Sequence, residues 1–142
     1  MFRTAVAATI AAGLLALPAL AEVSVEKLTM EAMEGMAMAE RSGMFEGRSN
    51  HVSSGGVELQ KTVSGGYVVV LGEDFMLDGG PDPHVALGRN GEYDAETELG
   101  MLKELNGKQF YAIPASIDAA SVTEVFLWCN VADVPLAVAT LN

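Results

Sequence analysis

The sequence predicts an all-β domain, an antiparallel β-sandwich-like fold preceded by a signal peptide and one amphipathic helix. Two observations carry this prediction. After Gly43 the apolar period changes from helical to short runs, and Gly, Pro and Asn turn signals separate these runs. The runs are rich in β-branched and aromatic residues, which favour strands. The chain has 142 residues, which suits a single folded domain with a modest core.

Residues 1–21 have the composition of a cleavable export signal. Arg3 provides a positive charge, residues 4–17 form an uncharged apolar run, and a small-x-small motif ends at Ala21. The apolar run is shorter than the roughly 20 residues that a membrane span requires. We therefore expect cleavage near Ala21, a periplasmic or secreted location, and no stable membrane anchor in the mature protein. The alternative is an uncleaved N-terminal anchor.

Residues 22–42 are predicted to form an amphipathic, Met-rich helix or linker. Ser24 is a suitable N-cap and Gly43 a suitable stop signal. Apolar residues recur at three- or four-residue spacing, which is typical of one helical face. These residues are Val25, Leu28, Ala32, Met36 and Ala39.

Methionines are concentrated in and just after this segment. Thioethers are soft ligands that suit Cu(I), but methionine is also an adaptable packing residue and a good helix former. The sequence favours packing over metal capture. The residues concerned are Met30, Met33, Met36, Met38 and Met44.

From residue 43 to 142 we expect a single β domain made of short strands. Turn signals stand at Gly65-Gly66, at the Gly79 to Pro83 segment and at Asn106-Gly107. Residues 90–98 are expected to form a polar, acidic loop. The predicted strands cover residues 57–61, 67–71, 84–87, 108–113, 122–131 and 136–141.

The charge balance excludes two classes of partner. The chain has 19 acidic and 8 basic residues, and its formal net charge is −11. Such a surface repels nucleic acids and anionic lipids. A cationic partner or a metal ion is compatible with it, and simple solubility is the plainer explanation.

Cys129 is the only cysteine, so no disulfide can form within the chain. In an alternating strand, Val125, Leu127, Cys129 and Val131 would share one face. Aliphatic neighbours favour a small core residue, and the functional alternative is a redox thiol or a soft metal ligand.

His51 and His84 are the only histidines, and both adjoin turn residues. His84 lies close to Asp82, and these side chains together with Cys129 have the donor types of a copper or zinc site. Haem ligation by His or Met is chemically feasible, whereas covalent c-type attachment is excluded because there is no Cys-x-x-Cys-His motif. The alternative is that each histidine makes hydrogen bonds within its turn.

The chain contains neither a Gly-x-Ser-x-Gly nucleophile motif nor a Walker-type phosphate loop. This favours an accessory or binding domain over an enzyme. A hydrolase is the least favoured of the functions considered.

An ordered series of short motifs resembles the DM-thirteen domain family, an electron-transfer-type domain associated with DOMON modules. The series includes Gly43-Met44-Phe45-Glu46-Gly47, Glu73-Asp74-Phe75 and Val125-Phe126-Leu127-Trp128-Cys129. The resemblance implies a β-sandwich-like domain in which Cys129 acts in redox chemistry. Pro83 and His84 stand where the family has a hydrophobic and an aromatic residue. The motif residues carried over are His51, Gly55, Pro81, Asp82, Trp128 and Cys129.

The function expected from the sequence is that of an exported, non-hydrolytic electron-transfer accessory domain with a redox or envelope protein as its partner. Copper or haem is the cofactor considered, with a redox metal bound through Cys129. The alternative is a non-catalytic envelope or extracellular binding module in which Cys129 is structural.

Overall fold

The computed structural model describes residues 37–142. The expected signal peptide (residues 1–21) and most of the expected helix (residues 22–42) lie outside this part. Across residues 37–142, no helix is long and apolar enough to cross a bilayer. The domain is all-β and its strand pairs are antiparallel, which confirms the predicted fold class.

The described residues form a nine-stranded sheet in the order β7-β6-β10-β11-β1-β3-β4-β9, in which β8 pairs with β6. A two-stranded sheet of β2 and β5 accompanies it, and η1 (Ala95–Thr97) and η2 (Ala119–Ser121) are short 3-10 turns. The strands are β1 (Ala37–Gly47), β2 (Ser53–Ser54), β3 (Gly56–Thr62), β4 (Tyr67–Leu71), β5 (Met76–Leu77), β6 (Pro83–Arg89), β7 (Glu92–Asp94), β8 (Gly100–Met101), β9 (Gln109–Ile113), β10 (Glu124–Cys129) and β11 (Val134–Thr140).

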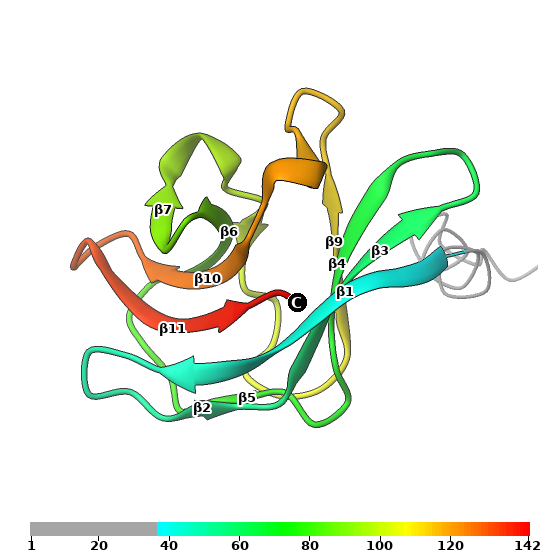
Figure 1. Cartoon of the computed structure of the whole chain (residues 1–142). Helices are drawn as coiled ribbons and strands as arrows, with labels where there is room; N and C mark the ends of the chain where they lie inside the picture. The colour runs from blue at the N-terminus through cyan, green and yellow to red at the C-terminus, as the bar shows by residue number, and fades with distance from the viewer. Residues whose placement is uncertain (1–36) are drawn as a thin grey trace, which may run out of the picture.

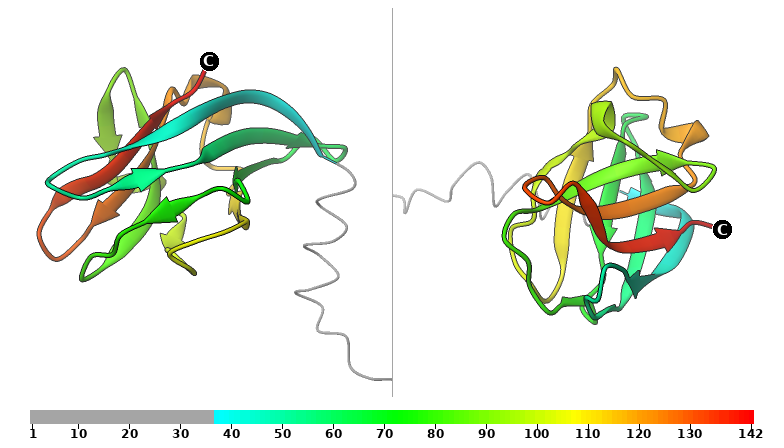
Figure 2. Two further views of the ribbon diagram at one scale, coloured as in Figure 1. Left: turned by 90° about the horizontal axis from the view of Figure 1, so that it is seen from below. Right: turned by 90° about the vertical axis from the view of Figure 1, so that its left-hand side faces the viewer.

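The long strand β1 connects the two halves of the sheet (Figure 1). Its residues 37–44 pair with β3, and residues 45–47 pair with β11. A Cβ atom on Gly43 would overlap the carbonyl oxygen of Thr140, so the close approach of β1 and β11 requires glycine there. The sheet curls around the core, as two further views show (Figure 2).

The helix predicted over residues 22–42 is wrong at its C-terminal end. Residues 37–42 belong to β1 and pair with β3, with a register shift between Ala39 and Arg41. The helical spacing of Met36 and Ala39 is a local preference, whereas the ladder with β3 satisfies the backbone groups through a distant segment. Tertiary pairing therefore overrides the local pattern.

The core lies between the two halves of the curled sheet, which makes the domain sandwich-like. Alternate residues of β3, β4, β6, β9 and β10 point into it, as expected for a sheet with one covered face. Phe45 and Phe75 pack edge to face in this core, with ring centroids 5.4 Å apart. Other core side chains are Val57, Leu59, Val69, Leu71, Val85, Leu87, Val125 and Leu127.

Residues 90–98, expected as a loop, contain β7 and the turn η1. Asn90 and Gly91 have φ values of 53° and 84°, so they form a tight turn between β6 and β7. Asp94 then accepts a hydrogen bond from the N–H of Glu96 at 3.0 Å, which caps η1. This hairpin brings Tyr93 to the side of the sheet that faces away from the core.

Candidate functional site

Cys129 is the last residue of β10, and its side chain is fully buried in the core, with 0 % of its surface exposed. In the strand ladders it lies opposite Pro83 of β6 and Val134 of β11. The thiol is free, and its Sγ accepts a hydrogen bond from the N–H of Ala132 at 3.4 Å. The sulfur therefore occupies the place of a small core side chain.

The prediction that Val131 shares the inward face of Cys129 is wrong. β10 ends at Cys129, and Val131 is 75 % exposed. The N–H of Asp133 donates to the carbonyl oxygen of Cys129 at 2.8 Å, and Asp133 has a φ of 55°. The strand alternation stops where this turn begins, so the alternation rule does not reach Val131.

His84 lies on the opposite side of the sheet from the sulfur of Cys129. It pairs directly with Trp128 in the ladder between β6 and β10, and directly opposed residues share a face. Its Nε2 lies 2.9 Å from the Oδ1 of Asp82, and its Nδ1 forms an ion pair with Glu98. The imidazole is thus held between two carboxylates, and the sheet separates it from Cys129.

His51 makes a different contact. Its Nδ1 lies 2.9 Å from the Oδ1 of Asp78, and the other oxygen of Asp78 accepts the Val52 N–H at 3.0 Å. The hydrogen bond from Val52 and the interaction with His51 lower the pKa of Asp78 below its usual value. The His51 side chain therefore contacts Asp78, a residue of the turn that follows β5.

The residues do not fit the expected copper or zinc site at Cys129. Within residues 37–142, no three His, Cys, Asp or Glu side chains converge as a metal site would require. The structure brings Asp82 to His84, but Asp82 and Glu98 contact different ring nitrogens. Met30, Met33 and Met36 lie outside the described residues.

Three rings form an aromatic cluster (Tyr93, Phe126, Trp128) on the outer face of β6, β7 and β10. The Tyr93 and Trp128 rings are stacked, with centroids 3.8 Å apart and planes inclined by 2°. Phe126 packs edge-on against both and is only 5 % exposed, although it points away from the core. Gly88 makes room for it, because a Cβ there would overlap the Phe126 ring and lie 2.5 Å from the Glu92 carbonyl oxygen.

Carboxylates surround the aromatic cluster. The indole Nε1 of Trp128 donates to the Oδ1 of Asp133 at 3.3 Å. Burial raises the pKa of Tyr93, and the negative charges of Glu98, Asp133 and Asp94 raise it further. These carboxylates make the electrostatic potential at the Tyr93 hydroxyl negative.

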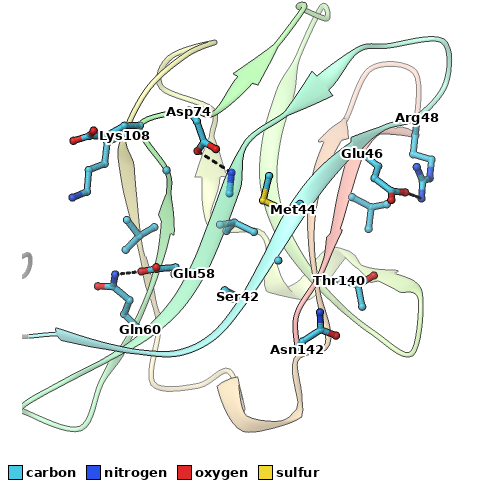
Figure 3. Close-up of a pocket in the computed structure, with 17 residues that line it drawn as sticks. Ser42, Met44, Glu46, Arg48, Glu58, Gln60, Asp74, Lys108, Thr140 and Asn142 are labelled. Atoms are coloured by element: carbon cyan, nitrogen blue, oxygen red, sulfur yellow. Dashed lines mark hydrogen bonds and ion pairs between the residues drawn. The ribbon is translucent and has the colours of Figure 1, made fainter.

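An open hollow of about 720 Å³ lies elsewhere, over β1, β3 and the end of β11 (Figure 3). Two pairs of its polar side chains bond to each other: Arg48 contacts Glu46 at 3.2 Å, and the side-chain amide of Gln60 donates to Glu58 at 2.6 Å. Of the residues considered for metal binding, only Met44 from the clustered methionines lines it, whereas Cys129, His51, His84 and Asp82 do not. The hollow is therefore separate from both Cys129 and His84.

A family model described as Electron transfer DM13 matches residues 44–141, nearly the whole described domain. The chain belongs to this family. No curated protein and no solved structure gives a match. The family resemblance found in the sequence is thereby confirmed. The DM13 match covers residues on both faces of β10.

The motif residues of the DM13 domain have different structural roles. Gly55 has a φ of 94°, and a Cβ there would lie 2.5 Å from the Asp74 carbonyl oxygen, so glycine is required by the backbone. Cys129 fills the core, Pro81 is exposed, and Trp128 stacks at the outer face. These motif residues therefore do not gather into one site.

Tyr93, Glu98 and Asp133 are not among the site residues predicted from the sequence, and Phe126 appears there only as part of a family motif. One signal was present in the sequence, because Asn90-Gly91 is a strong two-residue hairpin signal. Such a hairpin folds the residues that follow back against β6. The stacking of Tyr93 on Trp128, which lies 35 positions further along the chain, had no local signal.

Proposed function

We propose that this DM13 protein is an exported accessory domain of an electron-transfer system that acts by binding a redox protein. In this proposal Cys129 is a core residue and not the redox centre. The observation that carries it is the complete burial of the Cys129 side chain on the face of the sheet opposite His84. Family membership supports the link with electron transfer.

Burial argues against direct chemistry at the sulfur. A soft metal ion, an oxidant or a disulfide partner must touch Sγ. Reactive cysteine thiols are typically partly exposed and lie near a positive charge. The side chains of Val125 and Leu127 share the inner face with Cys129 and belong to the same apolar core. A redox metal bound through Cys129 would therefore require additional ligands inside that core.

The experiment is thiol labelling of the purified protein with an aromatic disulfide reagent, in buffer and in denaturing urea. We expect Cys129 to react slowly in buffer and fast in urea, because the thiol becomes accessible only on unfolding. Equal labelling rates in the two conditions would contradict a structural role of Cys129 and would support the alternative that it is a redox thiol. An exposed cysteine engineered as Val131→Cys, in a Cys129→Ala background, gives the rate of an accessible thiol in the same fold.

Export is part of the proposal and has its own test. The signal-like composition of residues 1–21 supports cleavage after Ala21 and release into the periplasm or the medium. Mass spectrometry of the protein isolated from an exporting bacterial host should give an N-terminus at Glu22. Recovery of the intact chain from the membrane fraction would contradict it.

A further inference from the structure

We propose that the outer face of β6, β8 and β10 is a docking surface for a basic patch on the redox protein that this domain binds. This inference rests on the proposed function and names the surface through which it acts. The surface is called the β6–β10 face below. It comprises His84, Tyr93, Met101, Trp128 and Val131, together with the carboxylates of Asp82, Glu98 and Asp133.

The apolar part of the β6–β10 face is a row of cross-strand neighbours. Met101 lies opposite His84 in the ladder between β8 and β6, and His84 lies opposite Trp128 in the ladder between β6 and β10. Directly opposed residues share a face, so the three side chains line up across the strands. Met101 is 61 % exposed, and the exposed Val131 follows in the turn after β10. Aromatic and methionine side chains of this kind are enriched at protein interfaces.

The strands that carry this row lie together at one side of the curled sheet, with β7 beside β6 (Figure 1). β7 stands at one end of the sheet, and its Tyr93 stacks on Trp128 of β10. The outer edge of the aromatic cluster is partly exposed, since neither Tyr93 nor Trp128 is fully buried. The rings therefore offer a rigid apolar surface whose positions are set by stacking.

The rim of the face is negatively charged. Asp82 and Glu98 flank His84, and Asp133 accepts the indole N–H of Trp128. Each of these carboxylates has further acceptor positions that a lysine or arginine side chain can use. Burial is the largest cause of the raised pKa of Tyr93, and the charges that raise this pKa further are all carboxylates.

These features select the chemistry of the partner. Lysine and arginine side chains gain from the carboxylate rim and from cation–π contact with the exposed edge of the stacked rings. A single metal ion is a poor fit because Asp82 and Glu98 lie at opposite nitrogens of the imidazole. Nucleic acids and anionic lipids are repelled. Electron-transfer complexes are small and electrostatically steered, with interfaces often below about 1,200 Å².

The hollow over β1 and β3 provides a matched control surface. It also contains carboxylates, but Arg48 and Lys108 line it as well. Glu46 is already paired with Arg48. A basic partner that responded only to the net charge of −11 would not distinguish the two surfaces. A partner that docks on the β6–β10 face would lose more affinity when charges are removed from that face than when they are removed at the hollow.

The experiment titrates a lysine-rich c-type cytochrome into the purified protein at low ionic strength and measures the affinity by calorimetry. The double variant Glu98→Gln/Asp133→Asn removes two charges from the β6–β10 face. It keeps an oxygen acceptor for the side-chain amide of Asn130, which donates to Glu98 at 3.3 Å, and one for the indole of Trp128. The control Glu46→Gln/Glu73→Gln removes two charges at the hollow. We expect the first pair to weaken binding about tenfold and the control pair less than about twofold.

The single tryptophan gives a second readout of location. The indole N–H resonance of Trp128 should shift on binding, and the shift should disappear in high salt because exposed charges are then screened. Equal weakening by the two double variants, or binding with no shift at Trp128, would overturn the docking surface. So would a wild-type protein that does not bind the cytochrome. Thermal unfolding of both variants establishes that they are folded.

Failure of the docking surface can be told apart from failure of the proposed function. The labelling rate of Cys129 depends on the core and is independent of the rim carboxylates. A protected thiol with no binding at the β6–β10 face would reject only the docking surface. A reactive thiol would reject the structural role of Cys129 whatever the cytochrome does.

Discussion

Trp128 and Cys129 are neighbours in the chain but point to opposite faces of β10. Trp128 stacks on Tyr93 at the outer face, with ring centroids 3.8 Å apart, whereas Cys129 belongs to the core. Successive side chains of a strand alternate between faces, so the sheet itself separates the sulfur from the rings. Substitutions at the two positions should consequently affect different properties of the protein.

Cys129→Ala should lower the free energy of unfolding by about 1–3 kcal/mol, because it leaves a small cavity in a fully buried position. Urea denaturation monitored by circular dichroism measures the change. The Trp128 indole resonance and cytochrome binding should stay as in the wild type. The exposed Val131→Ala is the matched control and should change the stability by less than about 0.5 kcal/mol. A Cys129→Ala variant as stable as this control would contradict the core role.

Gly88→Ala should destabilise the domain by about 1–3 kcal/mol, since the added methyl group meets the Phe126 ring and the Glu92 carbonyl. It should also separate Tyr93 from Trp128 and change the near-ultraviolet circular dichroism of the aromatic cluster. Gly56→Ala is the control, because the atoms nearest to a Cβ there lie 3.8 Å away, an ordinary van der Waals distance. An unchanged aromatic spectrum and an unchanged free energy of unfolding in Gly88→Ala would contradict the close packing of Phe126 on Gly88.

Asp78 should contribute to stability in a pH-dependent way. Its pKa is lowered from 3.8, first by the Val52 N–H and then by His51. A carboxyl whose pKa is lower in the folded state stabilises the fold above its unfolded pKa and loses that contribution as the pH falls through the folded pKa. Asp78→Asn should therefore lose less stability than the wild type between neutral pH and pH values below 3.8.

Chemical denaturation at neutral and acidic pH checks this difference. Asp118→Asn serves as the control, because the Asp118 side chain makes no cap hydrogen bond at η2. Parallel acid losses in wild type and Asp78→Asn would contradict the linkage between Asp78 and its partners.

Tyr93 should ionise at a higher pH than an unperturbed tyrosine, for which the pKa is 10.0. Burial is the largest cause, and Glu98 is the first of the charges that add to it. Glu98→Gln should therefore lower the pKa of Tyr93, while that of Tyr111, which burial also raises, should not move. Titration of the tyrosine resonances by NMR separates the two residues.

The raised pKa of Tyr93 also determines how the free energy of unfolding changes at alkaline pH. A group with a raised folded pKa contributes stability below its unfolded pKa and loses it as the pH rises through the folded value. Tyr93→Phe should thus reduce the loss of stability above pH 10.0. An alkaline profile identical to that of the wild type would show that Tyr93 is not coupled to folding.

The sequence alone was sufficient for the fold class and the family. Alternation, β-branched runs and turn signals predicted strands at residues 67–71 and 108–113, where β4 and β9 lie. These features are local, because strand period and turn chemistry depend on neighbouring residues. The prediction of a helix over residues 22–42 is wrong at its C-terminal end because the deciding interaction is not local. Residues 37–42 pair with the distant strand β3.

Only the tertiary structure decided the site. Alternation placed Cys129 and Trp128 on different faces, but it carries no information on which face the rest of the chain covers. That depends on long-range packing: the curled sheet covers Cys129, and the β6–β7 hairpin brings Tyr93 onto Trp128. The contacts of His84 with Glu98, and of His51 with Asp78, likewise arise when distant segments meet in the folded domain, whereas Asp82 is only two residues from His84.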